Sequence, residues 1–284
     1  MKITSIENQF KTVILLGLLT ALLLWIGNLL GGSLGLTFAF IIVLIMNLVS
    51  YFFSDKIVLA LYRAKEVNKD SRIYHLVLEV VKKAEIPMPK VYTIKTKNPN
   101  AFATGRDPKH SAVVFTEGIL EILNEDELKG VIAHELSHIK NRDTLIATIA
   151  AVIAGTISYI ASMARWAAIF GGFGDRDRGK SLFEFLLLAI LAPFIALIIQ
   201  LAISRQREYL ADLTAAKITK KPNYLADALL KIEEGVKNHP LTFGSETTSS
   251  LFIANPFKAS TFINLFSTHP PIKERVARLR KMKV

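Results

Sequence analysis

The sequence contains no cysteine among its 284 residues. Disulfide bonds and thiolate metal sites are therefore excluded, and any metal ion has to be held by histidine and carboxylate side chains. Charge is also absent from one long stretch, since no Asp, Glu, Lys or Arg occurs from Thr12 to Ser54. Because 51% of the residues are apolar and the mean hydropathy is +0.36, the composition favours an integral membrane protein over an ordinary soluble domain.

The uncharged stretch predicts a hairpin of two membrane-spanning helices. It is about twice as long as the roughly 20 residues that one span needs. Gly31-Gly32-Ser33 and Gly35 interrupt it with residues that break a helix at little cost. We expect the spans at Thr12–Leu30 and Leu34–Phe53. A cleaved signal peptide is the alternative, but its apolar region is shorter and is not followed at once by a second one.

A second apolar pair, at Thr144–Ala164 and Leu182–Ser204, predicts another hairpin. Its connection, residues 171–180, combines glycines with three positive charges and therefore weakens the charge signal for its orientation. Two helices that are only partly inserted, or that are buried in protein, are the alternative interpretation.

The distribution of lysine and arginine predicts the orientation of the hairpins. The turn of the first hairpin carries neither residue, whereas both flanks of this hairpin do, and positively charged flanks stay in the cytoplasm. We therefore expect a multi-pass protein of the inner (plasma) membrane, in contact with the lipid bilayer, whose soluble part is cytoplasmic. The net charge of +11 is not accompanied by a nucleic-acid-binding motif, so we expect no nucleic-acid partner. The oligomeric state is not indicated.

The remaining sequence predicts one cytoplasmic domain in two parts. The chain then divides into a first hairpin (1–54), a first domain part (55–143), a second hairpin (144–204) and a second domain part (205–284). Periodic apolar residues predict helices, and short β-branched runs predict strands. The expected fold class is a mainly α integral membrane protein, α+β in type, with a small β-sheet. We expect helices at Ile73–Ala84, Glu117–Leu123, Glu125–Ile139, Tyr224–Val236 and Ile272–Lys281, strands at Val91–Ile94 and Ala112–Phe115, a turn between these strands at residues 105–108, and a mobile loop at Thr242–Ser250.

The segment His134-Glu135-Leu136-Ser137-His138 indicates a metal site. It lies in a helix that Asn124 can cap, with Glu127 completing a capping box. Histidines four residues apart project from one face of a helix, so both imidazoles can bind one tetrahedral ion. Glu135 is rotated by about 100° from His134 and lies beside the ion, where it can take a proton from water. Two uncoordinated histidines on an ordinary helix are the alternative, although an apolar helix makes them costly to bury.

A catalytic site of this kind needs a third protein ligand and leaves one coordination position to water. Glu208 is preferred because it follows the second apolar pair, which returns the chain to the membrane face where the histidine helix ends. Asp212, one helical turn on, can accept the N–H of a metal-bound imidazole. Spacing alone equally allows both carboxylates to pair with Arg205 and Arg207 on a solvated surface. The candidates for the third ligand are Asp143, Glu208, Asp212 and His269.

Four short motifs follow one another along the chain: Asn100-Ala101-Phe102-Ala103-Thr104-Gly105, His134 to His138 followed by Asn141 and Asp143, Arg207-Glu208 with Ala211-Asp212, and Thr268-His269-Pro270-Pro271. In this order they resemble HtpX-type proteases, which are membrane-bound zinc endopeptidases distantly similar to the CAAX prenyl proteases. The resemblance covers essentially the whole chain, both apolar pairs included. It implies a zincin-like catalytic domain and one Zn²⁺ per chain.

The resemblance also implies roles for single residues. Glu208 matches the third zinc ligand beside His134 and His138, and Asp212 matches the carboxylate that accepts a hydrogen bond from a bound imidazole. Asn100 matches a residue on the edge strand along which substrate lies. His269 and Arg275 match residues that contact substrate or the developing oxyanion, with His269 as a catalytic partner of Glu135. Asn100 in a turn and His269 as a cap of the final helix are structural alternatives.

The activity that the resemblance implies is zinc-dependent peptide hydrolysis with Glu135 as the general base. Its substrates would be membrane proteins or unfolded polypeptides, misfolded or damaged and cut in cytoplasmic segments, which is a quality-control role. Processing of a defined lipidated peptide is a second possibility. A non-catalytic metal-binding scaffold is a third, but it predicts histidines or carboxylates inside the spans, and residues 12–54 contain none.

Overall fold

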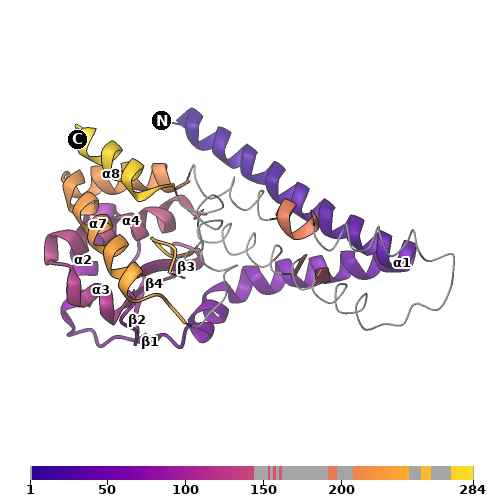
Figure 1. Cartoon of the computed structure of the whole chain (residues 1–284), viewed down its shortest axis with the longest axis horizontal. Coiled ribbons are helices and arrows are strands. Elements are labelled where there is room, and N and C mark those ends of the chain that lie inside the picture. Colours follow the sequence, from indigo (N-terminus) through magenta and orange to yellow (C-terminus); the bar gives the residue numbers. More distant parts are fainter. Residues whose placement is uncertain are drawn as a thin grey trace. The chain divides into compact units, whose positions relative to one another are not determined.

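The computed structural model describes residues 2–143, 207–242, 251–256 and 270–283, together with residues 153, 156–157, 160–161 and 191–196 (Figure 1). The chain divides into two compact units, residues 1–49 with 149–203 and residues 50–148 with 204–284. The described residues are mainly helical and include one four-stranded sheet, which lies in the second unit. This content confirms the α+β part of the predicted fold class, while the predicted segment boundaries stay predictions.

Helix α1, Lys2–Leu61, begins in the first unit and ends in the second. Its backbone is not helical at Gly31 (φ −149°, ψ 19°) and Gly32 (φ 56°, ψ −140°), two of the glycines for which we expect a turn. The positive φ of Gly32 lies in the region that favours glycine. A Cβ on Gly35 would overlap the carbonyl oxygen of Gly27. The two helical arms of α1 therefore approach each other closely at these glycines.

Among the described residues, no helix has both the length and the hydropathy that a membrane-spanning segment needs. The insertion of the first hairpin stays a prediction. The second predicted pair lies almost entirely outside the described residues, as does nearly all of the predicted loop at 242–250.

The sheet has the strand order β1-β2-β4-β3. Strands β2 and β4 pair in parallel, and the other two pairs are antiparallel. The seven-residue β3 therefore forms one edge of the sheet, and the two-residue β1 forms the other. The strands run from Lys65 to Glu66 (β1), Lys90 to Ile94 (β2), Ala101 to Asp107 (β3) and His110 to Thr116 (β4).

Strands β2 and β4 confirm the two predicted strands, but β3 has no counterpart among them. The turn predicted at residues 105–108 begins too early in the sequence, because Gly105 and Asp107 belong to β3 and pair with β4. Residues 101–105 are all buried, so β3 lacks the alternation by which a half-buried strand is recognised. Alanine and glycine, which make up much of β3, are also disfavoured in strands. The turn itself is confined to Pro108 and Lys109.

Helix α4 (Glu125–Asn141) packs against α2 (Arg72–Ala84), α7 (Pro222–Asn238) and strand β3. Its N-terminus has the predicted capping box, in which the Asn124 side chain accepts from the Glu127 N–H and the Glu127 side chain accepts from the Asn124 N–H, each at 2.9 Å. Because its neighbours bury most of its length, α4 is a rigid support for the side chains that it carries.

The remaining predicted helices are also present. They are α3 (Glu117–Ile122) and α8 (Ile272–Lys281), and the ends of the five helices predicted for the two domain parts lie within two residues of the observed ones. Residues 207–219 form a further helical stretch that lacks an N-terminal boundary within the described residues.

Residues 251–256 run beside the start of strand β3. The Ile253 N–H donates to the carbonyl oxygen of Ala101 at 2.9 Å, and Phe252 forms an antiparallel bridge with Phe102. The Phe252 ring also meets Tyr62, near the end of α1, edge-on with 5.0 Å between the ring centroids. This segment covers the first residues of the edge strand.

Candidate metal centre

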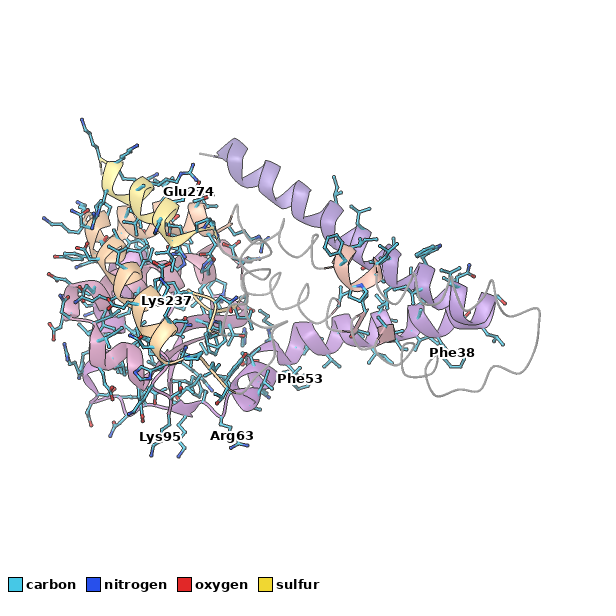
Figure 2. All side chains as sticks on the ribbon, in the orientation of Figure 1. Phe38, Phe53, Arg63, Lys95, Lys237 and Glu274 are labelled. Carbon is cyan, nitrogen blue, oxygen red and sulfur yellow. The ribbon has the colours of Figure 1, made fainter. Side chains whose placement is uncertain are left out.

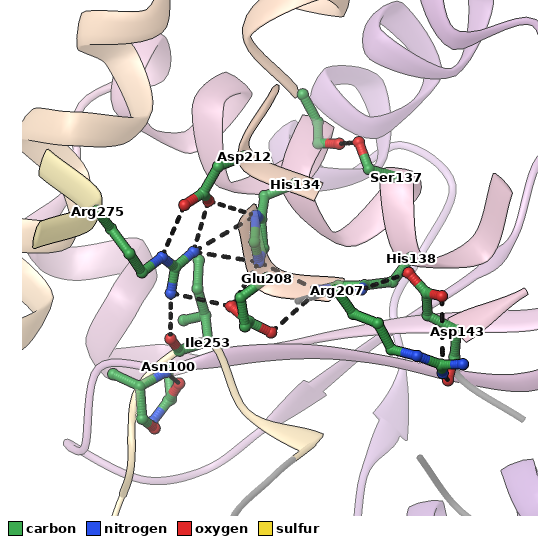
Figure 3. Close-up of polar contacts among 12 residues, drawn as sticks. Asn100, His134, Ser137, His138, Asp143, Arg207, Glu208, Asp212, Ile253 and Arg275 are labelled. Atoms are coloured by element: carbon green, nitrogen blue, oxygen red, sulfur yellow. Dashed lines mark hydrogen bonds and ion pairs between the residues drawn. The ribbon is translucent and has the colours of Figure 1, made fainter. Parts of the chain in front are cut away.

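Helix α4 carries His134, Glu135 and His138 into the interior of the second unit. His134 and Glu135 are 0% and 1% exposed, whereas His138 is partly exposed. The Nε2 atoms of the two imidazoles lie 3.2 Å apart (Figure 3). The spacing of four residues therefore brings both rings to one point, as predicted from the sequence.

Glu208 supplies the third group of the site from helical residues 207–219. Its Oε2 lies 3.5 Å from Nε2 of His134, and its Oε1 lies 3.4 Å from Nε2 of His138. Ligand atoms held about 2.0–2.1 Å from one tetrahedral ion are about 3.3 Å apart. The three observed separations, 3.2, 3.4 and 3.5 Å, are close to that value. Two imidazoles and one carboxylate therefore fit a metal ion here, and the three residues predicted as ligands form the candidate metal site of the described chain.

Two aspartates contact the outer nitrogens of the imidazoles, the Nδ1 atoms that face away from the candidate metal site. Nδ1 of His134 lies 3.0 Å from Oδ1 of Asp212, and Nδ1 of His138 lies 3.3 Å from Oδ2 of Asp143. An ionised carboxylate can only accept hydrogen bonds. Each contact therefore favours the imidazole tautomer that carries its hydrogen on Nδ1 and leaves an electron pair free on Nε2. Asp212 lies where the sequence predicted. Asp143 is one of the candidates for the third ligand, but the structure places its carboxylate at the outer nitrogen of His138 instead.

Arg275, from helix α8, is fully buried beside the site. Its guanidinium donates to both carboxylate oxygens of Asp212 at 2.9 and 2.7 Å, and its Nη1 lies 3.1 Å from Oε2 of Glu208 (Figure 3). Burial lowers the pKa of Arg275, but the charges of Asp212 and Glu208 outweigh burial and hold this pKa above its ordinary value. Arg275 thus neutralises two buried carboxylates, and it also donates to the Ile253 carbonyl at 3.1 Å.

The site perturbs the pKa values of its own groups. Burial raises the pKa of Glu135, although the charges of His134 and His138 oppose the shift. Burial lowers the pKa of His138, but hydrogen bonds with Asp143 and Glu208 outweigh it and raise the pKa to about 10. The site therefore favours positive charge at the imidazoles, which either protons or a metal ion can supply. A carboxylate with a raised pKa is also a stronger proton acceptor.

The surface alternative for Glu208 and Asp212 is wrong, because the two carboxylates are only 4% and 2% exposed. Arg207 is buried and lies beside Asp143 rather than beside these carboxylates, with 3.6 Å between its Nη1 and Oδ1 of Asp143. Arg205 lies outside the described residues.

The other predicted site residues are placed differently. Asn100 is buried, and its amide binds the backbone of Ala254, donating to the carbonyl at 2.8 Å and accepting from the N–H at 3.3 Å. His269 lies outside the described residues. The sequence indicated neither the contact of Asp143 with His138 nor that of Arg275 with Asp212, which joins residues 63 positions apart.

Replacing Arg275 with methionine is expected to lower the stability of the second unit. The change leaves two buried carboxylates without their opposing charge, and an uncompensated buried charge costs about 3–5 kcal/mol. The melting temperature of the full chain in detergent should fall by roughly 10 °C. Arg280→Met, on the same helix, removes only an exposed ion pair with Asp227 and should have little effect. Equal melting temperatures for the two variants would contradict the assigned role.

The fold and the site define a class of protein. A helix with the HExxH pattern, a glutamate ligand from a second helix, and carboxylates on the outer imidazole nitrogens are features of metallopeptidases. Within this class, the chain belongs to peptidase family M48, whose family model matches residues 67–283. The matched range contains every residue described above for the metal centre.

Similar proteins cover nearly the whole chain. A protein called protease HtpX homolog, from Syntrophobacter fumaroxidans, is 49% identical over 280 residues, which are 97% of this chain and 99% of that protein. A second one, from Pyrococcus furiosus, is 52% identical over 274 residues, 96% of this chain and 95% of that protein. The resemblance to HtpX-type proteases is confirmed, and the chain is a metalloprotease.

A solved structure has a similar fold. Ste24p from S. mikatae superposes with a TM-score of 0.53 at 18% sequence identity, over 98% of this chain and 65% of that protein. The chain therefore spans about two thirds of the length of Ste24p, and this likeness concerns the fold alone.

Proposed function

We propose that the chain is a zinc endopeptidase with Glu135 as its general base. The observation that carries this proposal is the triangle of ligand atoms from His134, His138 and Glu208, whose edges of 3.2–3.5 Å match a tetrahedral ion. Two histidines and a glutamate are one of the ligand sets used by catalytic zinc. Zinc bound there would polarise the scissile carbonyl and lower the pKa of its water towards about 7.

The remaining steps of peptide hydrolysis are assigned to side chains around the metal site. The Glu135 carboxylate takes a proton from the attacking water and passes it to the nitrogen of the leaving amine. Asp212 holds the His134 imidazole with its Nε2 electron pair directed inward.

We also retain roles in substrate binding for Asn100, Arg275 and His269. For Asn100 this role rests on its motif alone, because its buried amide already binds the backbone of Ala254. For Arg275 this role also rests on the resemblance, because its buried guanidinium already contacts Asp212, Glu208 and the Ile253 carbonyl. His269 is proposed as an oxyanion partner from its motif alone.

Membrane insertion of the first hairpin is a further part of the proposal. Helix α1 exposes many large apolar side chains, among them Leu34 (71%), Phe38 (64%) and Phe53 (47%), and Figure 2 shows both phenylalanines at the outside of its ribbon. An extended apolar surface of this kind is rare on soluble proteins. With charge absent from residues 12–54, it supports a hairpin in the bilayer with both ends in the cytoplasm.

This orientation has a direct test, because the chain lacks cysteine. Ser33→Cys places a thiol in the turn of the hairpin, and Lys69→Cys places one at an exposed position beyond it. In intact cells, a membrane-impermeant maleimide should label Ser33→Cys, and it should label Lys69→Cys only after permeabilisation. The reverse pattern would contradict the proposed orientation.

Misfolded or damaged membrane proteins, cut in cytoplasmic segments, are the proposed substrates. A protease domain that is joined in sequence to a membrane hairpin favours substrates that are held at the same membrane. The test compares the proteins of membranes that contain active enzyme with those that contain Glu135→Ala. Many different membrane proteins should accumulate with the variant. Accumulation of a single lipidated precursor would indicate a processing protease instead, and no accumulation together with no chelator-sensitive cleavage of an unfolded protein would indicate a metal-binding scaffold.

A further inference from the structure

Asp143 reaches His138 through a local turn of the backbone. Helix α4 ends at Asn141, and Arg142 adopts the left-handed conformation (φ 60°, ψ 31°), with its N–H donating to the carbonyls of His138 and Ile139. This conformation is unfavourable for a residue other than glycine, so surrounding contacts have to stabilise it. The turn brings Asp143 back along the helix, where its Oδ2 lies 3.3 Å from Nδ1 of His138.

Arg207 holds Asp143 from the other side. Its Nη1 donates to the backbone carbonyl of Asp143 at 3.1 Å and lies 3.6 Å from the carboxylate oxygen Oδ1. Both side chains are almost completely buried (8% and 7% exposed for the two residues), so water screens the pair only weakly. One arginine therefore fixes both the backbone and the carboxylate of Asp143.

The contact of Arg207 with Asp143 bears on the metal site because of where Arg207 lies in the sequence. Arg207 directly precedes Glu208, the ligand that comes from the second helix. The contact between Arg207 and Asp143 thus joins the end of the helix with the two histidines to the start of the segment with the glutamate. It parallels the contact of Arg275 with Asp212 on the other imidazole.

We propose that Asp143 and Arg207 are positioning residues of the metal centre. Asp143 fixes the tautomer and the plane of the His138 ring, and Arg207 holds Asp143 in place while it sets the separation of His138 and Glu208. This inference rests on the proposed zinc site. It differs from an ordinary buried ion pair, which would stabilise the fold without changing how the site holds zinc.

The test measures zinc affinity by chelator competition and the visible spectrum after cobalt substitution, on the full chain in detergent. Asp143→Ala should weaken zinc binding by about 10- to 100-fold and change the cobalt spectrum. Asp143→Asn keeps an acceptor for the Nδ1 hydrogen and should recover most of the affinity. Arg207→Met should weaken zinc binding less than Asp143→Ala does. The double variant should bind zinc as tightly as Asp143→Ala alone, since Arg207 acts on the metal site through Asp143. Asp70→Ala, which changes an exposed aspartate, is the matched control.

Wild-type affinity and an unchanged cobalt spectrum in Asp143→Ala, with only a lower melting temperature, would overturn the inference. If Asp143→Ala fails to fold, Asp143→Glu tests the inference in its place, because this variant keeps the negative charge but displaces the carboxylate oxygens from His138. An unchanged spectrum and affinity in that variant would also overturn it. If the wild-type chain itself binds no zinc, the proposed function fails, and that result is distinct from either outcome above.

Discussion

Glu135→Gln is expected to lose peptide cleavage while it keeps its metal ion. Glutamine has nearly the same shape as glutamate but cannot accept a proton, and removing a general base lowers the rate by about 100- to 10,000-fold. Glu135 lies beside the ligand atoms rather than among them, so zinc content should stay at the wild-type value. The measurement combines hydrolysis of an unfolded model protein in detergent with the zinc content of the same samples.

The control for this prediction is Glu125→Gln. It lies on the same helix, is exposed, and forms only a surface ion pair with Arg72. Its cleavage rate should equal that of the wild type. Full activity of Glu135→Gln would show that another group takes the proton, and loss of zinc from this variant would show that Glu135 is itself a ligand.

Glu208→Ala is expected to lose its metal ion. The variant removes one of three protein ligands and leaves two imidazoles from neighbouring helical turns, which cannot by themselves complete a tetrahedral site. The loss of affinity should exceed the roughly 10- to 100-fold that removal of an outer hydrogen-bond partner causes. Zinc content after dialysis against a weak chelator should fall close to zero, and cleavage should disappear with it.

Glu121→Ala serves as the matched control for Glu208→Ala, since Glu121 is exposed on helix α3. This variant should retain wild-type zinc. A Glu208→Ala protein that keeps its zinc would require another third ligand. Asp143 and Asp212 would then be the first candidates, because each already contacts one of the imidazoles.

The centre of the site could be predicted because its signals are local. The capping box of Asn124 and Glu127 fixes where helix α4 begins, and from there the spacing of His134 and His138 places both rings on one face. Periodicity also placed α2, α7 and α8 to within two residues of their ends. These features depend on residues within one or two helical turns of each other.

The remaining parts of the site depend on contacts that the sequence does not encode locally. Strand β3 is buried and rich in small residues, so it has neither alternation nor β-propensity. The contact of Asp143 with His138 depends on a left-handed Arg142, which has no sequence signature because glycine is the residue expected there. Glu208 could be preferred over its rivals only from its place after the second apolar pair and from a resemblance to known proteases, since its partners lie about 70 residues away in the sequence.

X-ray absorption at the zinc edge, on the full chain purified without added chelator, tests the central claim most directly. The account predicts about one zinc per chain, with nitrogen and oxygen ligands at about 2.0–2.1 Å and the outer-shell scattering of two imidazole rings. In Glu208→Ala this signal should disappear. An active protein without bound metal, or a bound zinc whose surroundings contain no imidazole, would contradict the account.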